Sequence, residues 1–196
     1  MKGRVILLAL VGALALSGCT LVAPNAAPVR IAPKDVQFGL LNKTIPDTNG
    51  VRVRFVTQTV YIVDASGQLA PSSRIVPKPP ALATVIEQLL LGPTRIEKLV
   101  GYSSALPKSL VVVSAEVHGV TAYLNFATPL SHLPRKQQLL AVGQLVLTAN
   151  VVGATRGTPI RGVEIRVAGV TQSLLLPNGK HATLATPEDF QSLLNG

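Results

Sequence analysis

Two apolar runs, Leu110–Val117 and Val120–Phe126, stand on either side of the dipeptide His118-Gly119. Runs rich in β-branched residues, separated by two residues that end in glycine, predict a β-hairpin with this dipeptide as its turn. Successive side chains point to opposite faces of a strand, so Val120, Ala122, Leu124 and Phe126 share one face and Thr121, Tyr123 and Asn125 share the other. We expect the first face to pack against the core and the second to be more exposed to solvent.

A second hairpin is predicted earlier in the chain. Val51–Val63 has an extended pattern and is followed by Asp64-Ala65-Ser66-Gly67. The aspartate can hydrogen-bond to its own backbone and the glycine tolerates positive φ, as a turn requires. Leu69–Val76 then returns as the partner strand. The prolines among residues 77–80 end the sheet, because proline cannot donate to a strand ladder.

Helical spacing of apolar residues marks two segments. Ala81–Leu91 carries an apolar stripe between Pro80 and Gly92-Pro93, which suit the start and the end of a helix. Between the two segments, Thr94-Arg95-Ile96-Glu97 has the form of a capping box and predicts a short helix that Gly101 ends. The second segment opens at Pro134, with an apolar stripe of Leu139, Val142, Val146 and Ala149, and with Gln137, Gln138 and Gln144 mostly off that stripe.

The last third of the chain adds short elements. Val163, Ile165 and Val167 alternate with charged residues and predict a strand, and Leu174–Leu176 predicts another. Thr186-Pro187-Glu188-Asp189 has the cap and the acids of a helix start. The elements together predict an α+β fold, in which two long helices pack on one face of a mostly antiparallel sheet.

The N-terminus has the pattern of an export signal. A basic start and the apolar run Val5–Leu16 lead into Leu16-Ser17-Gly18-Cys19, which matches the lipobox of bacterial lipoproteins. The match implies that residues 1–18 are removed and that Cys19, the only cysteine, is lipidated. An ordinary secretory signal with an incidental cysteine is the alternative. Residues 19–50 are rich in proline and predict a semi-extended tether, and residues 51–196 predict a single domain with a C-terminal extension.

The charge balance bears on the partners. Eighteen Lys and Arg residues stand against nine Asp and Glu. Loss of Lys2 and Arg4 with the signal leaves sixteen against nine, a net charge of +7. Such an excess suits a surface that faces anionic lipid or anionic wall polymer. The basic residues are scattered and no aromatic residues lie among them, so we do not expect nucleic-acid binding.

Motifs of catalysis are not found. The three histidines, His118, His132 and His181, have no metal-ligand spacing, and H-E-x-x-H, G-x-S-x-G and S-x-x-K are missing. For Ser103-Ser104, capping of local structure is the expected use. We therefore expect no catalytic residues, no metal and no cofactor, although the sequence leaves open a meeting of two carboxylates in space.

Several segments resemble the GerMN domain, the module named for bacterial sporulation and spore germination lipoproteins and also found in the actinobacterial lipoprotein LpqB. The matching segments are Val60–Asp64 with Gly67 and Leu69, Leu89–Thr94, Gly101–Pro107, Val117–Phe126, Gln144–Thr148 and Val163–Gly169. The resemblance covers roughly residues 51–170. It implies an α+β envelope module on a lipoprotein, an LpqB-like N-terminal module without the propeller, and no known catalyst. Physically, Gly92-Pro93 is expected to end a helix, Pro107 to start a strand and Gly101 to permit a turn. The alternative is that the Gly92–Thr94 and Gly101–Pro107 loops lie together and form a contact surface.

Three functional hypotheses remain. The first is a non-enzymatic, lipid-anchored envelope module that binds a protein partner. The second is direct binding of anionic cell-wall polymer through six basic residues, Arg52, Arg54, Arg74, Lys98, Lys108 and Arg166. The third is a wall-modifying hydrolase with two titratable groups in a deep cleft. Thr20 after the cysteine predicts the outer membrane in a two-membrane cell and the outer face of the plasma membrane otherwise. The oligomeric state stays open.

Overall fold

The computed structural model describes residues 53–194. The predicted signal peptide at 1–18, Cys19 with the tether at 19–50, and Val51, where the first strand is expected to begin, lie outside the described residues. Every element described below belongs to one compact unit, Arg52–Gly196.

The first hairpin is formed by β1 (Phe55–Val63) and β2 (Leu69–Pro77), paired antiparallel from Phe55↔Pro77 to Val63↔Leu69. The predicted turn is confirmed: Asp64 Oδ1 accepts the backbone N–H groups of Ser66 and Gln68 at 2.8 and 3.0 Å. Gly67 has a φ of 81°. The predicted strand start was too early, since Val53 precedes β1. Phe55 already pairs with the last residue of β2, so the described residues Val53 and Arg54 have no strand residue opposite them.

The second hairpin is formed by β3 (Val112–His118) and β4 (Thr121–Phe126). The hairpin is confirmed, but its turn is Gly119-Val120, one residue later than predicted, because His118 still pairs with Thr121. Gly119 has a φ of 60°, which fits the first central position of a two-residue turn. The shift leaves Val120 46% exposed instead of in the core. The predicted apolar face otherwise holds, with Ala122, Leu124 and Phe126 fully buried.

The second hairpin belongs to a four-stranded sheet with the order β3-β4-β5-β6. β5 (Gly162–Val167) is the predicted strand, and β6 (Val170–Thr171) pairs with it antiparallel. β4 and β5 are parallel, with Thr121 opposite Gly162. A parallel pair needs a long crossover connection, and the helix between these strands supplies it. The sheet is therefore mixed, with one parallel pair inside a mostly antiparallel arrangement.

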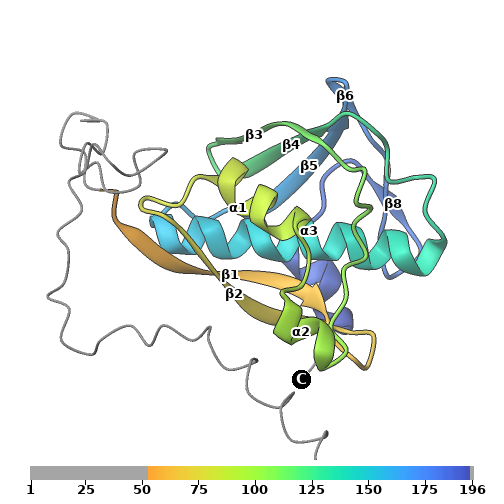
Figure 1. Cartoon of the computed structure of the whole chain (residues 1–196). Helices are drawn as coiled ribbons and strands as arrows, with labels where there is room; N and C mark the ends of the chain where they lie inside the picture. The colour runs from red at the N-terminus through yellow and green to blue at the C-terminus, as the bar shows by residue number, and fades with distance from the viewer. Residues whose placement is uncertain (1–52, 195–196) are drawn as a thin grey trace, which may run out of the picture. The chain divides into compact units, whose positions relative to one another are not determined.

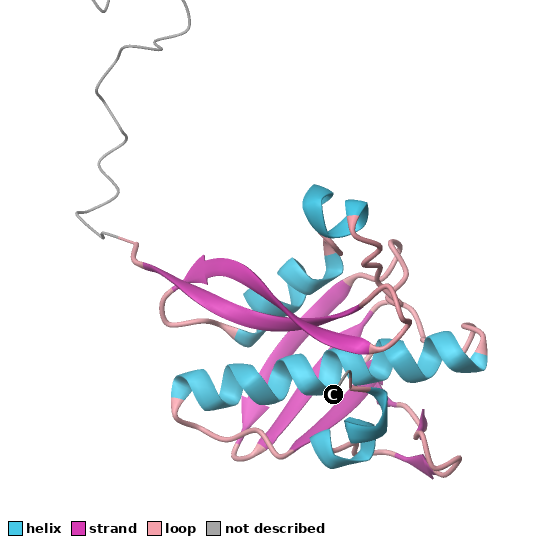
Figure 2. Cartoon of the chain, turned by 90° about the horizontal axis from the view of Figure 1, so that it is seen from below, coloured by secondary structure: helices cyan, strands magenta, loops and turns pink. Residues whose placement is uncertain are grey.

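Two helices pack between this sheet and the first hairpin. α1 (Leu82–Leu90) contacts β3, β1 and β2, and α3 (Arg135–Arg156) contacts β1, β5 and α1. Figures 1 and 2 show both helices along one face of the sheet, with the β1–β2 hairpin against them. The predicted class, α+β with helices on one face of the sheet, is confirmed. Of the two helices, only α3 is long.

The middle of α3 is buried on every side. Each residue from 140 to 149 is buried, including Gln144, which was expected to fall mostly off the apolar stripe. That expectation was wrong because α3 lies between the four-stranded sheet and the first hairpin, so the middle of the helix has no solvent-exposed face. By length and hydropathy α3 could cross a membrane, but 67% of its most apolar window is buried inside the domain, as in the core helix of a globular fold.

The C-terminal segment closes the core. β7 (Leu174–Leu175) pairs with β8 (His181–Ala182), a strand that the sequence did not predict. The predicted terminal helix is the 3₁₀ helix η3 (Pro187–Leu193), opened by a capping box of Thr186 and Asp189. Phe190 on η3 is fully buried. A Cβ atom on Gly143 of α3 would lie 3.0 Å from Phe190 Cδ1, so glycine permits this close approach.

Candidate functional site

The two loops that the sequence singled out lie side by side. A Cβ atom built on Gly92 would be 3.8 Å from Ser104 Cβ, and one built on Gly101 would be 2.9 Å from Ala65 Cβ. The turn of the first hairpin, which contains Ala65, therefore lies next to the two loops. We call residues 64–67, 92–94 and 101–107 the loop cluster. These contacts agree with the alternative interpretation of the sequence, in which the Gly92–Thr94 and Gly101–Pro107 loops lie together.

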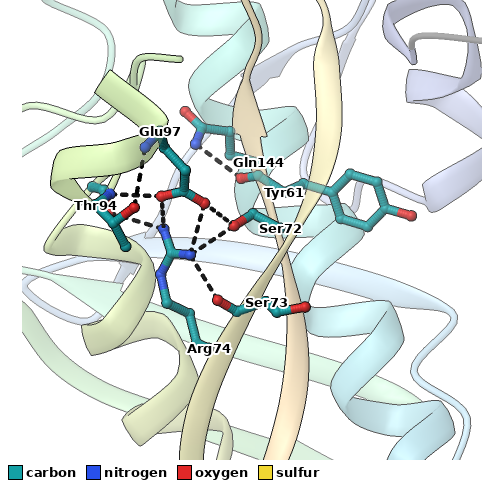
Figure 3. A network of polar contacts seen from close by, with 8 residues as sticks. Tyr61, Ser72, Ser73, Arg74, Thr94, Glu97 and Gln144 are labelled. Atoms are coloured by element: carbon teal, nitrogen blue, oxygen red, sulfur yellow. Dashed lines mark hydrogen bonds and ion pairs between the residues drawn. The ribbon is translucent and has the colours of Figure 1, made fainter. Parts of the chain in front are cut away.

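An ion pair between β2 and α2 (Arg95–Leu99) ties this cluster together. Arg74 donates to Glu97 Oε1 and Oε2, each at 3.1 Å, and to the carbonyl oxygen of Gly92 at 3.0 Å. Ser72 Oγ also donates to Glu97. Figure 3 shows the guanidinium of Arg74 between β2 and the carboxylate. Only 8% of the Arg74 side chain is exposed, so the pair is largely withdrawn from water.

Glu97 also completes the predicted capping box. The backbone N–H of Thr94 donates to Glu97 Oε2 at 2.6 Å, and Thr94 Oγ1 accepts the backbone N–H of Glu97 at 3.3 Å. Burial alone would raise the pKa of Glu97, but hydrogen bonds from Arg74, Ser72 and Thr94 outweigh it and lower the pKa from 4.5 to about 2. The carboxylate therefore stays ionised and bonded at any physiological pH.

Gln144 of α3 holds the second loop from inside the core. Its Nε2 donates to the carbonyl oxygen of Tyr61 at 2.9 Å, and its Oε1 accepts the backbone N–H of Ala105 at 2.8 Å. Gln137 Nε2 adds a bond to the carbonyl oxygen of Ala105 at 3.0 Å. Backbone bonds of 2.7 and 3.0 Å join Ser103 to Val63. The loop is thereby fixed to β1 and α3.

The sequence did not identify these glutamines as structural residues. One signal was present: Gln144 interrupts a long apolar run, and a buried amide must find hydrogen-bond partners. The partners themselves leave no local pattern, because Tyr61 lies 83 residues earlier in the chain.

A shallow pocket opens beside the loop cluster, with a volume of about 310 Å³. Its lining offers hydroxyl, amide and ammonium groups on an apolar base: Val63, Ser103, Ser104, Ala105, Pro134, Lys136, Gln137 and Leu140. The set has no carboxylate and no histidine. Ser104 Oγ accepts the backbone N–H of Leu106 at 3.2 Å, which is the capping use expected from the sequence. These groups can bind a ligand, but they hold no general base.

A second pocket, of about 230 Å³, lies at the other end of α3. It is lined by Val117, Gly119, Gly153, Arg156, Thr158 and Ile160, again without a carboxylate. Among residues 53–194, no group of three His, Cys, Asp or Glu side chains could hold a metal ion. His118 contacts Glu116 at 3.0 Å on the surface, and His132 and His181 are exposed.

The six basic residues proposed for polymer binding do not form one free set. Arg52 lies outside the described residues. Arg74 is buried and bonded to Glu97. Arg166 bonds to Glu164 at 2.7 Å and stacks 4.4 Å from the ring centre of Tyr123. Arg54, Lys98 and Lys108 are exposed.

Comparison with known proteins gives a match at the level of the fold. The tandem GerMN domains of the sporulation protein GerM from Bacillus subtilis align with 68% of this chain and 47% of theirs, at a TM-score of 0.50 and 18% identity. The domain has a GerMN-like fold. The resemblance read from the sequence is thus confirmed for the fold, and the chain spans about half the length of the tandem structure.

Other comparisons are weaker. The first GerMN domain of GerM alone aligns with 68% of this chain and 98% of its own length, at a TM-score of 0.48 and 18% identity. A candidate lipoprotein of Clostridium perfringens aligns with 73% of this chain and 93% of its own, at a TM-score of 0.44 and 13% identity. No family model matches the sequence, and no curated protein matches it.

Proposed function

We propose that this chain is a non-enzymatic, lipid-anchored module of the cell envelope, and that its GerMN-like domain binds a protein partner through the loop cluster. The observation that carries the proposal is the fixing of both loops to the core by Arg74 and Gln144. A surface whose hydrogen bonds are already made loses little conformational freedom on binding, which favours recognition.

Two features support the other parts of the proposal. The lipobox ending at Cys19 supports anchoring by lipid to the outer face of the plasma membrane, or to the outer membrane in a cell that has one. The two pockets described above lack a carboxylate and lack a nucleophile paired with a base. This lining supports a binding role over the wall-modifying hydrolase.

Site-specific photo-crosslinking in cells tests the binding surface. We place the photoreactive residue at Ser103, which is exposed in the loop cluster, and in a matched control at Thr155. Both Thr155 and Lys136, which lines the pocket, are on α3, and they are 19 positions apart, which separates the two sites by about 30 Å along the helix. We expect the Ser103 probe to capture one protein reproducibly and the Thr155 probe not to. Equal capture at both positions, or none, contradicts the proposal.

The lipid anchor needs its own test. Mass spectrometry of the purified protein should find an acylated N-terminal cysteine, and Cys19→Ala should move the protein out of the membrane fraction. A membrane-bound Cys19→Ala protein with an intact signal would favour the ordinary secretory signal instead.

The salt dependence of binding distinguishes a wall-polymer partner from a protein partner. Polymer binding through exposed lysines and arginines would weaken steeply as ionic strength rises through the physiological range. We expect co-sedimentation with purified wall to be weak and the captured protein to persist at higher salt. Strong, salt-sensitive sedimentation with wall and no captured protein would favour the polymer.

A further inference from the structure

Helix α2 and its flanking residues expose four large aliphatic side chains at one place. Leu91 is 73% exposed, Ile96 76%, Leu99 79% and Val100 59%. No residue of α2 is buried. We call these four residues, together with Arg95 and Lys98, the α2 tip. A surface helix normally turns its apolar side chains to the core, so this arrangement needs an explanation.

The charged residues of α2 are also divided between its two sides. Its one acid, Glu97, points inward and is bonded to Arg74. Its two basic residues, Arg95 and Lys98, are exposed. The helix therefore presents aliphatic and cationic groups to the outside and withdraws its anion. Aliphatic side chains that enter the acyl boundary, beside cations that meet phosphate groups, are typical of elements that lie on an anionic bilayer.

The shape of the tip favours a bilayer over a protein groove. α2 stands at the margin of the fold in both views (Figures 1 and 2), and Gly101, which follows it, lies close to Ala65 in the turn of the first hairpin. Three of its four aliphatic side chains are Leu or Val, which are under-represented among the residues that dominate protein interfaces, whereas Leu is typical of the apolar face of elements that lie in the bilayer interface. The bonds of Glu97 to Arg74 and to Ser72 hold the helix firmly to β2.

We propose that the α2 tip docks on the anionic phospholipid surface of the membrane, with Leu91, Ile96, Leu99 and Val100 entering the interfacial layer and with Arg95 and Lys98 binding lipid phosphates. This contact is additional to the protein partner. It does not depend on the acyl chain at Cys19. Its effect is to hold the domain against the bilayer in one orientation.

Vesicle sedimentation tests this contact on the chain from residue 19 onward with Cys19→Ser, so that no acyl chain contributes. The vesicles contain phosphatidylcholine alone, or phosphatidylcholine with roughly one third phosphatidylglycerol, to supply the anionic charge that attracts basic residues. We expect the chain to sediment with the anionic vesicles and weakly with the neutral ones. Failure to sediment with either overturns the proposal.

Matched variants locate the contact. Ile96→Gln with Leu99→Gln should lower the affinity for anionic vesicles at least about tenfold, because two inserted side chains are lost. Val111→Gln with Val113→Gln removes two other exposed aliphatic side chains, 57% and 60% exposed, at the start of β3 and should change the affinity less than about twofold. All four side chains are on the surface, so the variants should fold. Equal losses in both variants overturn the proposal.

A fluorescence measurement separates the bilayer from other occupants of the tip. Cys19 is the only cysteine, so Leu99→Cys in the Cys19→Ser chain can carry one environment-sensitive dye, with Thr155→Cys as the control. We expect a blue shift at Leu99→Cys when anionic vesicles are added and none at Thr155→Cys. A blue-shifted spectrum before any vesicle is added would mean that a second copy or the chain's own N-terminal segment covers the tip, which overturns the proposal. Because this chain lacks lipid, its result is independent of the lipid anchor and of the Ser103 crosslink.

Discussion

Arg74 on β2 and Glu97 on α2 form an ion pair of 3.1 Å that fastens a helix with no buried residue to the fold. The ion pair attaches α2 to the fold, as the burial of an apolar stripe attaches other helices. Its side chains are 8% and 19% exposed, so they interact in surroundings with little water. Removing one partner leaves the other as a largely buried charge.

We expect Arg74→Met to lower the free energy of unfolding by about 3 kcal/mol, because Glu97 is left without its cation. Urea unfolding of the two proteins measures the difference. Lys98→Met on the exposed side of α2 is the control and should change the free energy by less than about 0.5 kcal/mol. A loss below about 1 kcal/mol for Arg74→Met would mean that α2 is held by other contacts.

The stability should depend on acid through Glu97. Its folded pKa, about 2, is below the usual 4.5, so its contribution is fully present above pH 4.5 and is lost as the pH falls toward 2. The difference between these pKa values corresponds to a free energy on the order of 3 kcal/mol. We expect the stability gap between the wild type and Glu97→Gln to narrow by about this amount over that range. If the difference in the free energy of unfolding between the two proteins stays constant over this pH range, Glu97 is not the cause of the acid dependence.

Gln144 makes a separate prediction about the loop cluster. Gln144→Met keeps the volume of the side chain but removes its hydrogen bonds, among them those to Tyr61 and to Ala105, so we expect a loss of about 1–3 kcal/mol in stability. Hydrogen exchange at the amide of Ala105 should become faster, since that N–H loses its acceptor. Gln138→Met, on a half-buried residue of the same helix, is the control. Unchanged exchange at Ala105 would show that the loop holds without Gln144.

The elements foreseen in the sequence are those with local signals. Both hairpins, α1 and the Thr94 capping box follow from alternation, helical spacing and caps within about ten residues of chain. The one-residue error at His118-Gly119 has a local cause too, because the sequence places a glycine in a turn but does not say at which of its two positions.

The features missed by the sequence analysis depend on distant residues. Arg74 and Glu97 are 23 residues apart, and Gln144 and Tyr61 are 83 apart. The parallel pairing of β4 with β5 depends on how α3 crosses the sheet. No periodicity within one segment records such contacts. The meeting of the two loops was one of two interpretations of their sequences, whereas the side chains that hold the loops were not identified.

Gln58 gives a prediction of the opposite sign. Its side chain is 1% exposed, and its Oε1 has no hydrogen-bond partner among the described residues. Gln58→Leu removes this unsatisfied oxygen from the core of the hairpin, and we expect a gain of about 1 kcal/mol. The shift of the urea midpoint measures it. A loss of stability would mean that Oε1 has a partner, such as a buried water.

Substitution of two glycines with positive φ, Gly119 and Gly101, distinguishes the cost of backbone strain from the cost of a steric clash in the loop cluster. Gly101 has a φ of 87°, and a Cβ there would lie 2.9 Å from Ala65 Cβ, whereas Gly119 has a φ of 60° and open space around it. Gly119→Ala should therefore show the backbone penalty alone, about 1 kcal/mol. Gly101→Ala should lose clearly more, because the loop must also move away from the turn at residues 64–67. Since that movement displaces Ser103, crosslinking from Ser103 should fall in Gly101→Ala and persist in Gly119→Ala. Equal stability losses and unchanged crosslinking would show that the close approach of Gly101 to Ala65 is not needed for the surface.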